Sequence, residues 1–128
     1  KRQALITSKY VQYLGWLDKD DLIGNISKAD ILLVPSRREP FGRITIEGLS
    51  CGTYLIMSDN VGAAHDLNDT KLGKTFISGN AESLFHEMCN SEENIKNIRD
   101  NSSYRRNWVK NNWTHEVSVD GLMRVIES

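Results

Sequence analysis

Two short stretches of this chain are apolar almost without interruption, and they anchor the interpretation of the rest. They read ILLVPS at residues 31–36 and TYLIMSD at residues 53–59. Such a run is typical of a strand that is buried on both faces of a parallel sheet. Pro35 ends the first run, and Gly52 precedes the second. We therefore predict two buried strands in the first half of the chain.

The segments around these runs complete an alternating order of strands and helices. Residues 10–17, YVQYLGWL, alternate in character and predict a strand that ends near Gly15. Asp18 can cap a helix that follows this strand, and residues 42–51 have the length of a second helix. The order strand, helix, strand, helix, strand predicts an α/β fold with a parallel, Rossmann-like sheet and right-handed crossovers.

The second half of the chain predicts one more strand and several helices. Residues 71–77, KLGKTFI, indicate a short strand, and Asn80 can cap a helix over the next eleven positions. Residues 91–112 are polar and predict a helix with a solvated face, and Thr114 is the expected cap of a last helix. The residues that should form the buried stripe of the helix after Asn80 are Ala81, Leu84, Phe85, Met88 and Cys89.

Composition and charge exclude several classes of protein. The chain has 128 residues, enough for a single domain over 1–128, and a net charge of −1. This charge balance gives no reason to expect nucleic acid as a partner. No apolar run approaches the ~20 residues that a membrane span needs. Cys51 and Cys89 fit neither a metal motif nor a disulfide framework, so we expect buried thiols in a reducing compartment.

The segment RREPFGRITIEG, residues 37–48, carries the candidate chemistry. It follows a strand, so it should lie beyond the carboxyl end of that strand, where open parallel sheets bind ligands. A helix that starts near Phe41 or Gly42 points unpaired N–H groups at an anion such as a phosphate. Gly42 permits a close approach to the backbone. Glu47 can accept hydrogen bonds from the two hydroxyls of a ribose, and Glu39 can contact a sugar beyond the phosphates.

A purely structural interpretation of the same residues stays open. An acid in an early helical turn is stabilised by the helix dipole by about 0.3–1 kcal/mol. Arg43 and Glu47 are four positions apart and can pair on the helix surface. Two glutamates and a glycine are therefore a weak signal when they are taken alone.

A wider pattern strengthens the ligand-binding interpretation. The run PSRREPFGRITIEGLSCGTYLIMSDNVGAAHDL, residues 35–67, resembles the donor-binding half of retaining GT-B glycosyltransferases of glycosyltransferase family 4, group 1. That family has two glutamates separated by seven residues, which are Glu39 and Glu47 here. Upstream, residues 11–36 are similar to the family's strand, Gly-aromatic turn and helix. Near the end, NNWTHE is similar to its FSW helix start.

The resemblance implies a role for each matching residue. Glu39 would be the catalytic residue that holds and positions the donor sugar. Glu47 would bind the ribose, and Leu17 would lie beside the nucleotide base. The backbone amides that would meet the diphosphate and the sugar belong to Phe41, Gly42, Arg43 and Ile44. The family needs no obligatory metal and no cofactor, since the nucleotide-diphosphate sugar is itself the substrate.

Several positions depart from the family pattern. Gly48 stands where the family usually has Ala, which lowers helix stability by roughly 1 kcal/mol. Tyr54 replaces a Pro, Ala63 replaces a second Gly, and Asp66 replaces a Glu. The family's basic phosphate-binding segment and its N-terminal acceptor domain have no counterpart here. We therefore expect a truncated C-terminal donor domain that is inactive by itself.

The function expected for the full-length protein is transfer of a sugar from a nucleotide sugar, with retention, in polysaccharide or glycoconjugate synthesis. The acceptor would be a sugar or a lipid-linked sugar, held by the missing domain. The expected location is the cytoplasm, with peripheral contact to the inner face of the membrane left open. Two alternatives remain: a sugar-nucleotide epimerase of GT-B architecture, and a degenerate donor domain that acts only as a binding module.

The remaining aromatic and basic residues have structural interpretations. Trp16 either stacks on a base or, as we favour, covers the edge of the sheet. Trp108 and Trp113 are expected to anchor a helix to the core. The residues that should form an exposed basic patch on a late helix are Arg105, Arg106 and Lys110.

Overall fold

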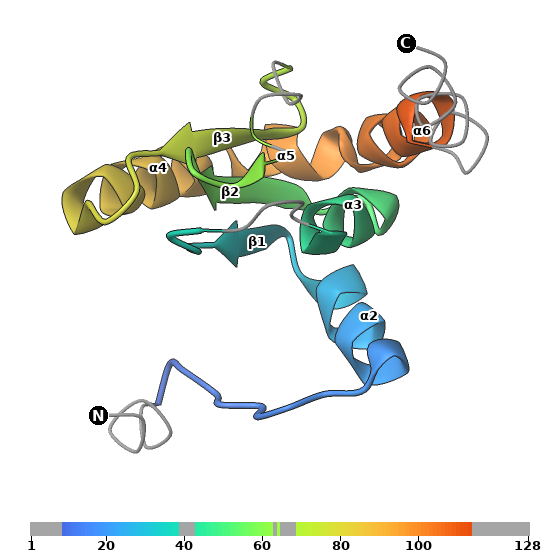
Figure 1. Cartoon of the computed structure of the whole chain (residues 1–128). Coiled ribbons are helices and arrows are strands. Elements are labelled where there is room, and N and C mark those ends of the chain that lie inside the picture. The colour runs from blue at the N-terminus through green and yellow to red at the C-terminus, as the bar shows by residue number, and fades with distance from the viewer. Residues whose placement is uncertain (1–8, 39–42, 63, 65–68, 114–128) are drawn as a thin grey trace, which may run out of the picture.

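A computed structural model of the chain describes residues 9–38, 43–62, 64 and 69–113. The strands are β1 (Ile31–Val34), β2 (Tyr54–Ser58) and β3 (Gly73–Phe76). The helices are α2 (Lys19–Lys28), α3 (Arg43–Ser50), α4 (Ala81–Glu93), α5 (Ile95–Asp100) and α6 (Ser102–Asn112). Figure 1 shows them in the order of the chain.

The three strands form one parallel sheet in the order β1-β2-β3. Leu32 pairs with Leu55 across the first pair of strands, and Met57 pairs with Thr75 across the second. The parallel α/β fold predicted from the alternating pattern is confirmed. The predicted strands at 31–36, 53–59 and 71–77 and the predicted helices over 42–51 and after Asp18 and Asn80 are all present.

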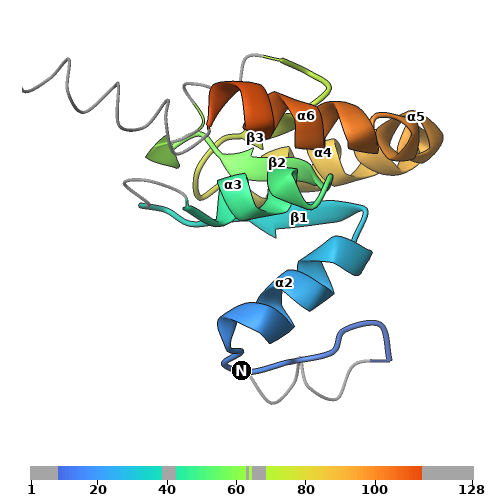
Figure 2. The same ribbon diagram turned by 90° about the vertical axis from the view of Figure 1, so that its right-hand side faces the viewer.

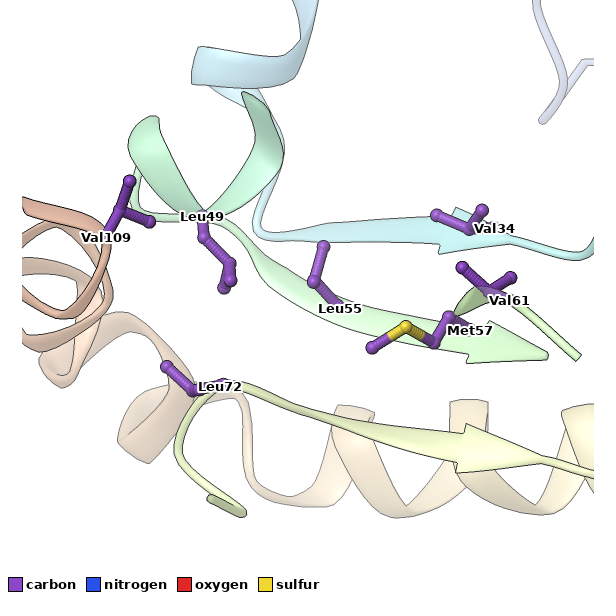
Figure 3. Packing of buried hydrophobic residues seen from close by; sticks show 7 residues of the cluster. All are labelled: Val34, Leu49, Leu55, Met57, Val61, Leu72 and Val109. Carbon is purple, nitrogen blue, oxygen red and sulfur yellow. The ribbon is translucent and has the colours of Figure 1, made fainter. Parts of the chain in front are cut away.

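Alternate residues of β2 face two separate hydrophobic layers. Leu55 and Met57 pack in a cluster with α3 and α6, where Figure 3 shows Leu49 and Val109 on the helical side. Tyr54 and Ile56 face the opposite layer, which α4 and α5 cover with residues such as Ile98. Every residue of β2 is therefore buried. Figures 1 and 2 show helices on both faces of the sheet.

The first strand predicted from the sequence is wrong. Residues 10–17 form no strand, and Trp16 is 90% exposed, so it does not cover the edge of the sheet. A doubly wound sheet has six strands in the spatial order 3-2-1-4-5-6, so its third strand pairs with its second and lies far from its fourth. If β1, β2 and β3 are the fourth, fifth and sixth strands of such a sheet, residues 10–17 stand at the place of the third strand. The described part of the chain then contains no strand with which they could pair.

Two further predictions of burial need correction. β1 is only partly buried, and Leu33 is 38% exposed, because β1 has a strand on one side only among the described residues. The stripe predicted on α4 is also only partly correct. Leu84 packs under β3, but Phe85 and Met88 are exposed. The face of α4 that packs against the sheet therefore buries fewer apolar side chains than the sequence predicted.

Helix ends follow the expected capping chemistry. The Asp18 carboxylate accepts a hydrogen bond from the Asp21 amide at 2.8 Å, and Asn80 accepts one from the Ser83 amide at 3.0 Å. Both predicted caps are confirmed. The predicted helix that starts at Thr114 lies outside the described residues.

Candidate functional site

The N-terminal turn of α3 lies at the carboxyl edge of the sheet. β1 ends at Val34, and α3 begins at Arg43 after a single connection. Because the strands are parallel, the ends of β2 and β3 lie at the same edge. The first N–H groups of a helix have no acceptor within that helix, and its dipole places partial positive charge there. This edge of the sheet therefore presents the partial positive charge of a helix N-terminus.

Hydrogen bonds link the three loops that leave this edge. The Asn60 side chain donates to the Arg37 carbonyl at 3.1 Å, which ties the loop after β2 to the loop after β1. The Asp59 carboxylate accepts a hydrogen bond from the Ser78 amide at 3.0 Å, which ties it to the loop after β3. The loop after β2 is thus hydrogen-bonded to the loops on both sides of it, beside the candidate site.

Close packing fixes α3 against the sheet. A Cβ atom at Gly48 would lie 2.8 Å from a methyl group of Leu32 and 3.0 Å from one of Leu55, so these side chains would have to shift. Gly48 therefore lowers helix propensity but lets α3 approach β1 and β2 closely. This contact gives a physical reason for the departure from Ala at this position.

A glycine turn ends α3 and returns the chain to β2. Gly52 has a φ of +82°, and the Gly52 and Thr53 amides donate to the carbonyls of Leu49 and Gly48, both at 2.9 Å. This is the Schellman arrangement, which needs a residue in the left-handed region and so favours glycine. The turn sets the direction in which α3 runs, and hence the edge at which its first turn lies.

The structure places three of the predicted site residues on α3. Arg43 is its first residue and its side chain is 82% exposed, whereas the side chain of Glu47 is 22% exposed. Their charged groups lie 3.8 Å apart, from Nε to Oε1, so the surface ion pair considered above is present. The half-buried Ile44 packs against the core cluster, which leaves its backbone as the part available to a ligand.

The other predicted site residues are not brought to this turn. Leu17 lies just before α2, a helix that Figure 1 shows running away from the sheet. The end of α2 that is fastened to the sheet is the C-terminal one, where the Thr53 hydroxyl donates to the Ile26 carbonyl at 3.1 Å. Other positions of interest lie outside the described residues, and they are Glu39, Phe41, Gly42, Ala63, His65 and Asp66.

Glu47 also acts on its neighbour one turn later. The thiol of Cys51 is partly buried, and this burial, together with the negative charge of Glu47, raises the pKa of Cys51. A higher pKa leaves less of the reactive thiolate at neutral pH. The sequence predicted buried thiols, but Cys51 and Cys89 are both only partly buried.

The opposite edge of the sheet holds a buried cation that the sequence analysis missed. Arg105 of α6 is only 1% exposed, so the prediction of a solvated patch is wrong for this residue. Its guanidinium donates to the carbonyls of Gly52 at 2.8 Å and Lys71 at 2.9 Å, and also to that of Ile98. Burial lowers the pKa of Arg105 from the usual arginine value. Arg106 is exposed, as predicted.

Trp108 and Trp113 pack against the core cluster, so their expected role as helix anchors is confirmed.

Within the described ranges, no group of three His, Cys, Asp or Glu side chains is placed to hold a metal ion. No helix in the part of the chain that the structure describes combines the length and the apolar character of a membrane span.

Comparison with solved structures supports the architecture. The chain superposes on sucrose-phosphate synthase from Thermosynechococcus elongatus with a TM-score of 0.81 at 23% sequence identity. The match covers 98% of this chain and 33% of that protein. At this identity the likeness shows a shared fold, a Rossmann-like domain of a GT-B protein.

Comparison with curated sequences points to one enzyme class. The chain is 34% identical to a glycogen synthase of Mycobacterium tuberculosis (strain ATCC 25618 / H37Rv) over 53% of its length and 14% of that protein. It is 28% identical to an uncharacterized glycosyltransferase of Methanocaldococcus jannaschii over 92% of its length and 33% of that protein. A phosphatidyl-myo-inositol mannosyltransferase of Propionibacterium freudenreichii subsp. shermanii is 28% identical over 70% of this chain and 24% of its own length.

The chain spans a third or less of each of these relatives. A family model described as glycosyl transferases group 1 matches residues 1–115, which is most of the sequence. This chain therefore belongs to the glycosyl transferases group 1 family.

Proposed function

We propose that this domain binds a nucleotide-diphosphate sugar at the N-terminal turn of α3 and serves as the donor half of a retaining glycosyltransferase. One observation carries the proposal. α3 begins at the carboxyl edge of a parallel sheet, and an accessible carboxylate, Glu47, lies one turn after its first residue. Family membership supports transferase chemistry for the protein that contains this domain.

The diphosphate would lie at the end of α3. The backbone amides of Arg43 and Ile44 belong to its first turn, and Phe41 and Gly42 precede them in the sequence. The Arg43 side chain is exposed and its pairing with Glu47 is long, so it can turn toward a phosphate at small cost. Glu47 is then free to accept the hydroxyls of the ribose.

Positive charge at this edge would stabilise the leaving group. When the glycosidic bond breaks, the nucleotide diphosphate gains negative charge, and preorganised donors that face it lower the barrier. The helix end supplies such donors, and the exposed side chains of Arg37, Arg38 and Arg43 supply formal charge nearby. Glu39 is proposed to hold the donor sugar, and Leu17 remains the predicted neighbour of the base.

The test is a titration of the intact protein with UDP-glucose, ADP-glucose and GDP-mannose, followed by calorimetry. We expect one of these donors to bind and Glu47→Ala to weaken its binding about tenfold or more, since two hydrogen bonds to the ribose are lost. Glu82→Ala is the matched control, because Glu82 is also an acid in an early helical turn, on α4. Equal affinity of the Glu47→Ala variant and the parent protein would remove the assigned role.

Chemistry separates the proposal from its alternatives. With a labelled donor and an acceptor mixture, transfer with retained anomeric configuration is expected, and Glu39→Ala should reduce transfer far more than stability. Interconversion of the donor sugar without an acceptor would instead indicate an epimerase. Failure of all three nucleotide sugars to bind would favour a module without catalytic function.

A further inference from the structure

A polar cavity lies at the edge of the sheet opposite to α3's first turn. Its volume is about 360 Å³, and its wall includes Tyr54, the first residue of β2, and Lys74, the second residue of β3. The rest of the wall comes from the loop before β3, which contributes Lys71, from the second half of α4, from α5 and α6, and from the junctions between these helices. Because the strands are parallel, this is the amino edge, so the cavity and the proposed donor site lie at opposite edges of the sheet.

The wall carries an unusual number of side-chain amides. Asn90, Asn94, Asn97 and Asn101 follow one another at intervals of three or four residues and all line the cavity. Asn94 donates to the Asn90 carbonyl at 2.8 Å, and Asn101 donates to the Asn97 carbonyl at 2.9 Å. Each amide has two donor hydrogens and an acceptor oxygen. The amides therefore offer both kinds of hydrogen bond that sugar hydroxyls use.

Capping explains only part of this arrangement. Asn94 lies between α4 and α5, and Asn101 lies between α5 and α6, so both have a structural reason to be asparagine. The Asn97 side-chain oxygen accepts a hydrogen bond from Asn101, and the Asn90 side chain pairs with His86 at 3.1 Å. Neither junction requires basic side chains on the facing wall. The combination of amides and cations in one cavity remains to be explained.

The charge of the wall is positive. The lining includes three cations, Lys71, Lys74 and Arg105, and one acid, Glu87. The Lys71 ammonium lies 4.8 Å from the centre of the Tyr104 ring. Arg105 is buried, its described hydrogen bonds go to carbonyl oxygens, and its guanidinium lies 5.7 Å from the centre of the Tyr54 ring. A buried cation with no carboxylate partner among the described residues favours an anion in the adjacent space.

From these contacts we infer a second binding site, in which the amino-edge cavity holds the phosphate of a sugar phosphate between Lys71 and Lys74, beside the buried charge of Arg105, and its hydroxyls against the asparagine amides. The volume lies in the lower part of the range that ligand pockets occupy, which suits a monosaccharide phosphate. Glu87 is placed to accept a sugar hydroxyl. The site is separate from the proposed donor site and does not depend on it.

The test measures binding of glucose 6-phosphate, glucose and inorganic phosphate to the intact protein by calorimetry. We expect glucose 6-phosphate to bind more tightly than either of its parts. The variant Lys71→Ala/Lys74→Ala should bind it at least about tenfold more weakly, since charge-assisted hydrogen bonds to the phosphate are lost. Both lysines are exposed, so this variant should fold.

Lys96→Ala/Lys110→Ala is the matched control. It removes two exposed lysines that do not line the cavity and changes the net charge equally, so its affinity should stay within about twofold of the parent. Equal loss in both variants would show a diffuse charge effect and overturn the site. No binding of glucose 6-phosphate, or binding no tighter than that of phosphate alone, would overturn the assigned ligand class.

Competition separates the two sites. Saturating nucleotide sugar should leave the affinity for glucose 6-phosphate unchanged, because the cavity lies at the other edge of the sheet. Displacement would place the sugar phosphate at α3 and overturn the inference, whatever the outcome for the donor site.

Discussion

The two edges of the small parallel sheet differ in how their polar groups are arranged. At the amino edge, the Arg105 guanidinium joins the loops that lead into β2 and β3 to the end of α5, and it is fully enclosed. At the carboxyl edge, Arg43 extends into solvent, and the nearest charged partner of Glu47 is 3.8 Å away. The Arg105 cation of the amino edge is therefore enclosed and joins elements of the fold, whereas the Arg43 cation of the carboxyl edge is exposed.

This difference teaches where substitutions should affect stability and where they should affect binding. Enclosed polar groups are costly to lose, because their partners remain buried without a hydrogen bond. Exposed pairs contribute little to stability, because water replaces each partner. Substitutions of enclosed groups should therefore lower the free energy of unfolding more than substitutions of exposed ones.

Gly73→Ala should cause the largest loss of stability. A Cβ atom at Gly73 would lie 2.2 Å from the Leu55 carbonyl oxygen, so β2 and β3 would have to separate. We expect the free energy of unfolding to fall by about 3 kcal/mol or more, measured by urea denaturation. Gly24→Ala is the control, since nothing lies within 4 Å of the new methyl group and the helix should gain about 1 kcal/mol. Equal effects at the two glycines would contradict the close strand contact.

Arg105→Met should rank second. The substitution leaves three carbonyl groups without their donor, although it also removes the cost of burying a charge, so we expect a loss of about 2–3 kcal/mol. Arg106→Met alters the next residue, which is exposed and whose hydrogen bonds within the described part of the chain go to Ser102 and Ser103. Its unfolding free energy should stay within about 0.5 kcal/mol of the parent. A smaller loss in the Arg105 variant than in the Arg106 variant would remove the contrast between the two edges.

Glu47→Gln should have little effect on folding. Among the described residues its ionic partner is Arg43, at long range and largely in solvent, so the expected loss is about 0.5 kcal/mol or less. The same variant should bind the donor nucleotide less well. A thermal melt and a nucleotide titration of the same sample check both statements. A destabilised protein with unchanged affinity would assign Glu47 to the scaffold.

Asp30→Asn should give the smallest change, and one that depends on pH. Asp30 accepts two hydrogen bonds from Arg99, at 2.9 and 3.2 Å, and this partner lowers the pKa of Asp30 in the folded state. The stabilisation is therefore present above the unfolded pKa of about 3.9 and is lost as the pH falls through the lower folded value. The difference in urea midpoint between parent and variant should be visible at pH 7 and should shrink below about pH 4. A difference that grows in acid would contradict this sign.

Much of the fold could be predicted from the sequence because the deciding signals are local. The uninterrupted apolar runs identified β1 and β2, and the polar caps Asp18 and Asn80 marked the starts of α2 and α4. The position of the candidate site followed from the same reasoning, since a parallel sheet fixes the edge at which α3 must begin. Its chemistry was suggested by the spacing of two acids, of which Glu47 lies in the described residues.

The failures all concern partners that are distant in the sequence. Residues 10–17 have the composition of a strand, but a strand forms only beside another strand. Arg105 lies among polar residues, as a solvent-facing arginine would, and its burial depends on three carbonyls that are 7 to 53 positions away. Phe85 has the spacing of a core residue, but no neighbour covers it among the described elements. Pattern alone does not show which contacts the tertiary structure will supply.

The hydrogen bonds of Arg105 also affect which parts of this protein should unfold locally under native conditions. Since one side chain connects α6 to the loops before β2 and β3, detaching α6 would leave the Gly52 and Lys71 carbonyls without this donor. Its amide hydrogens should therefore exchange with solvent deuterium only as fast as those of β2. The amides of α2, whose described hydrogen bonds to the sheet involve only its C-terminal end, should exchange by local opening and much earlier.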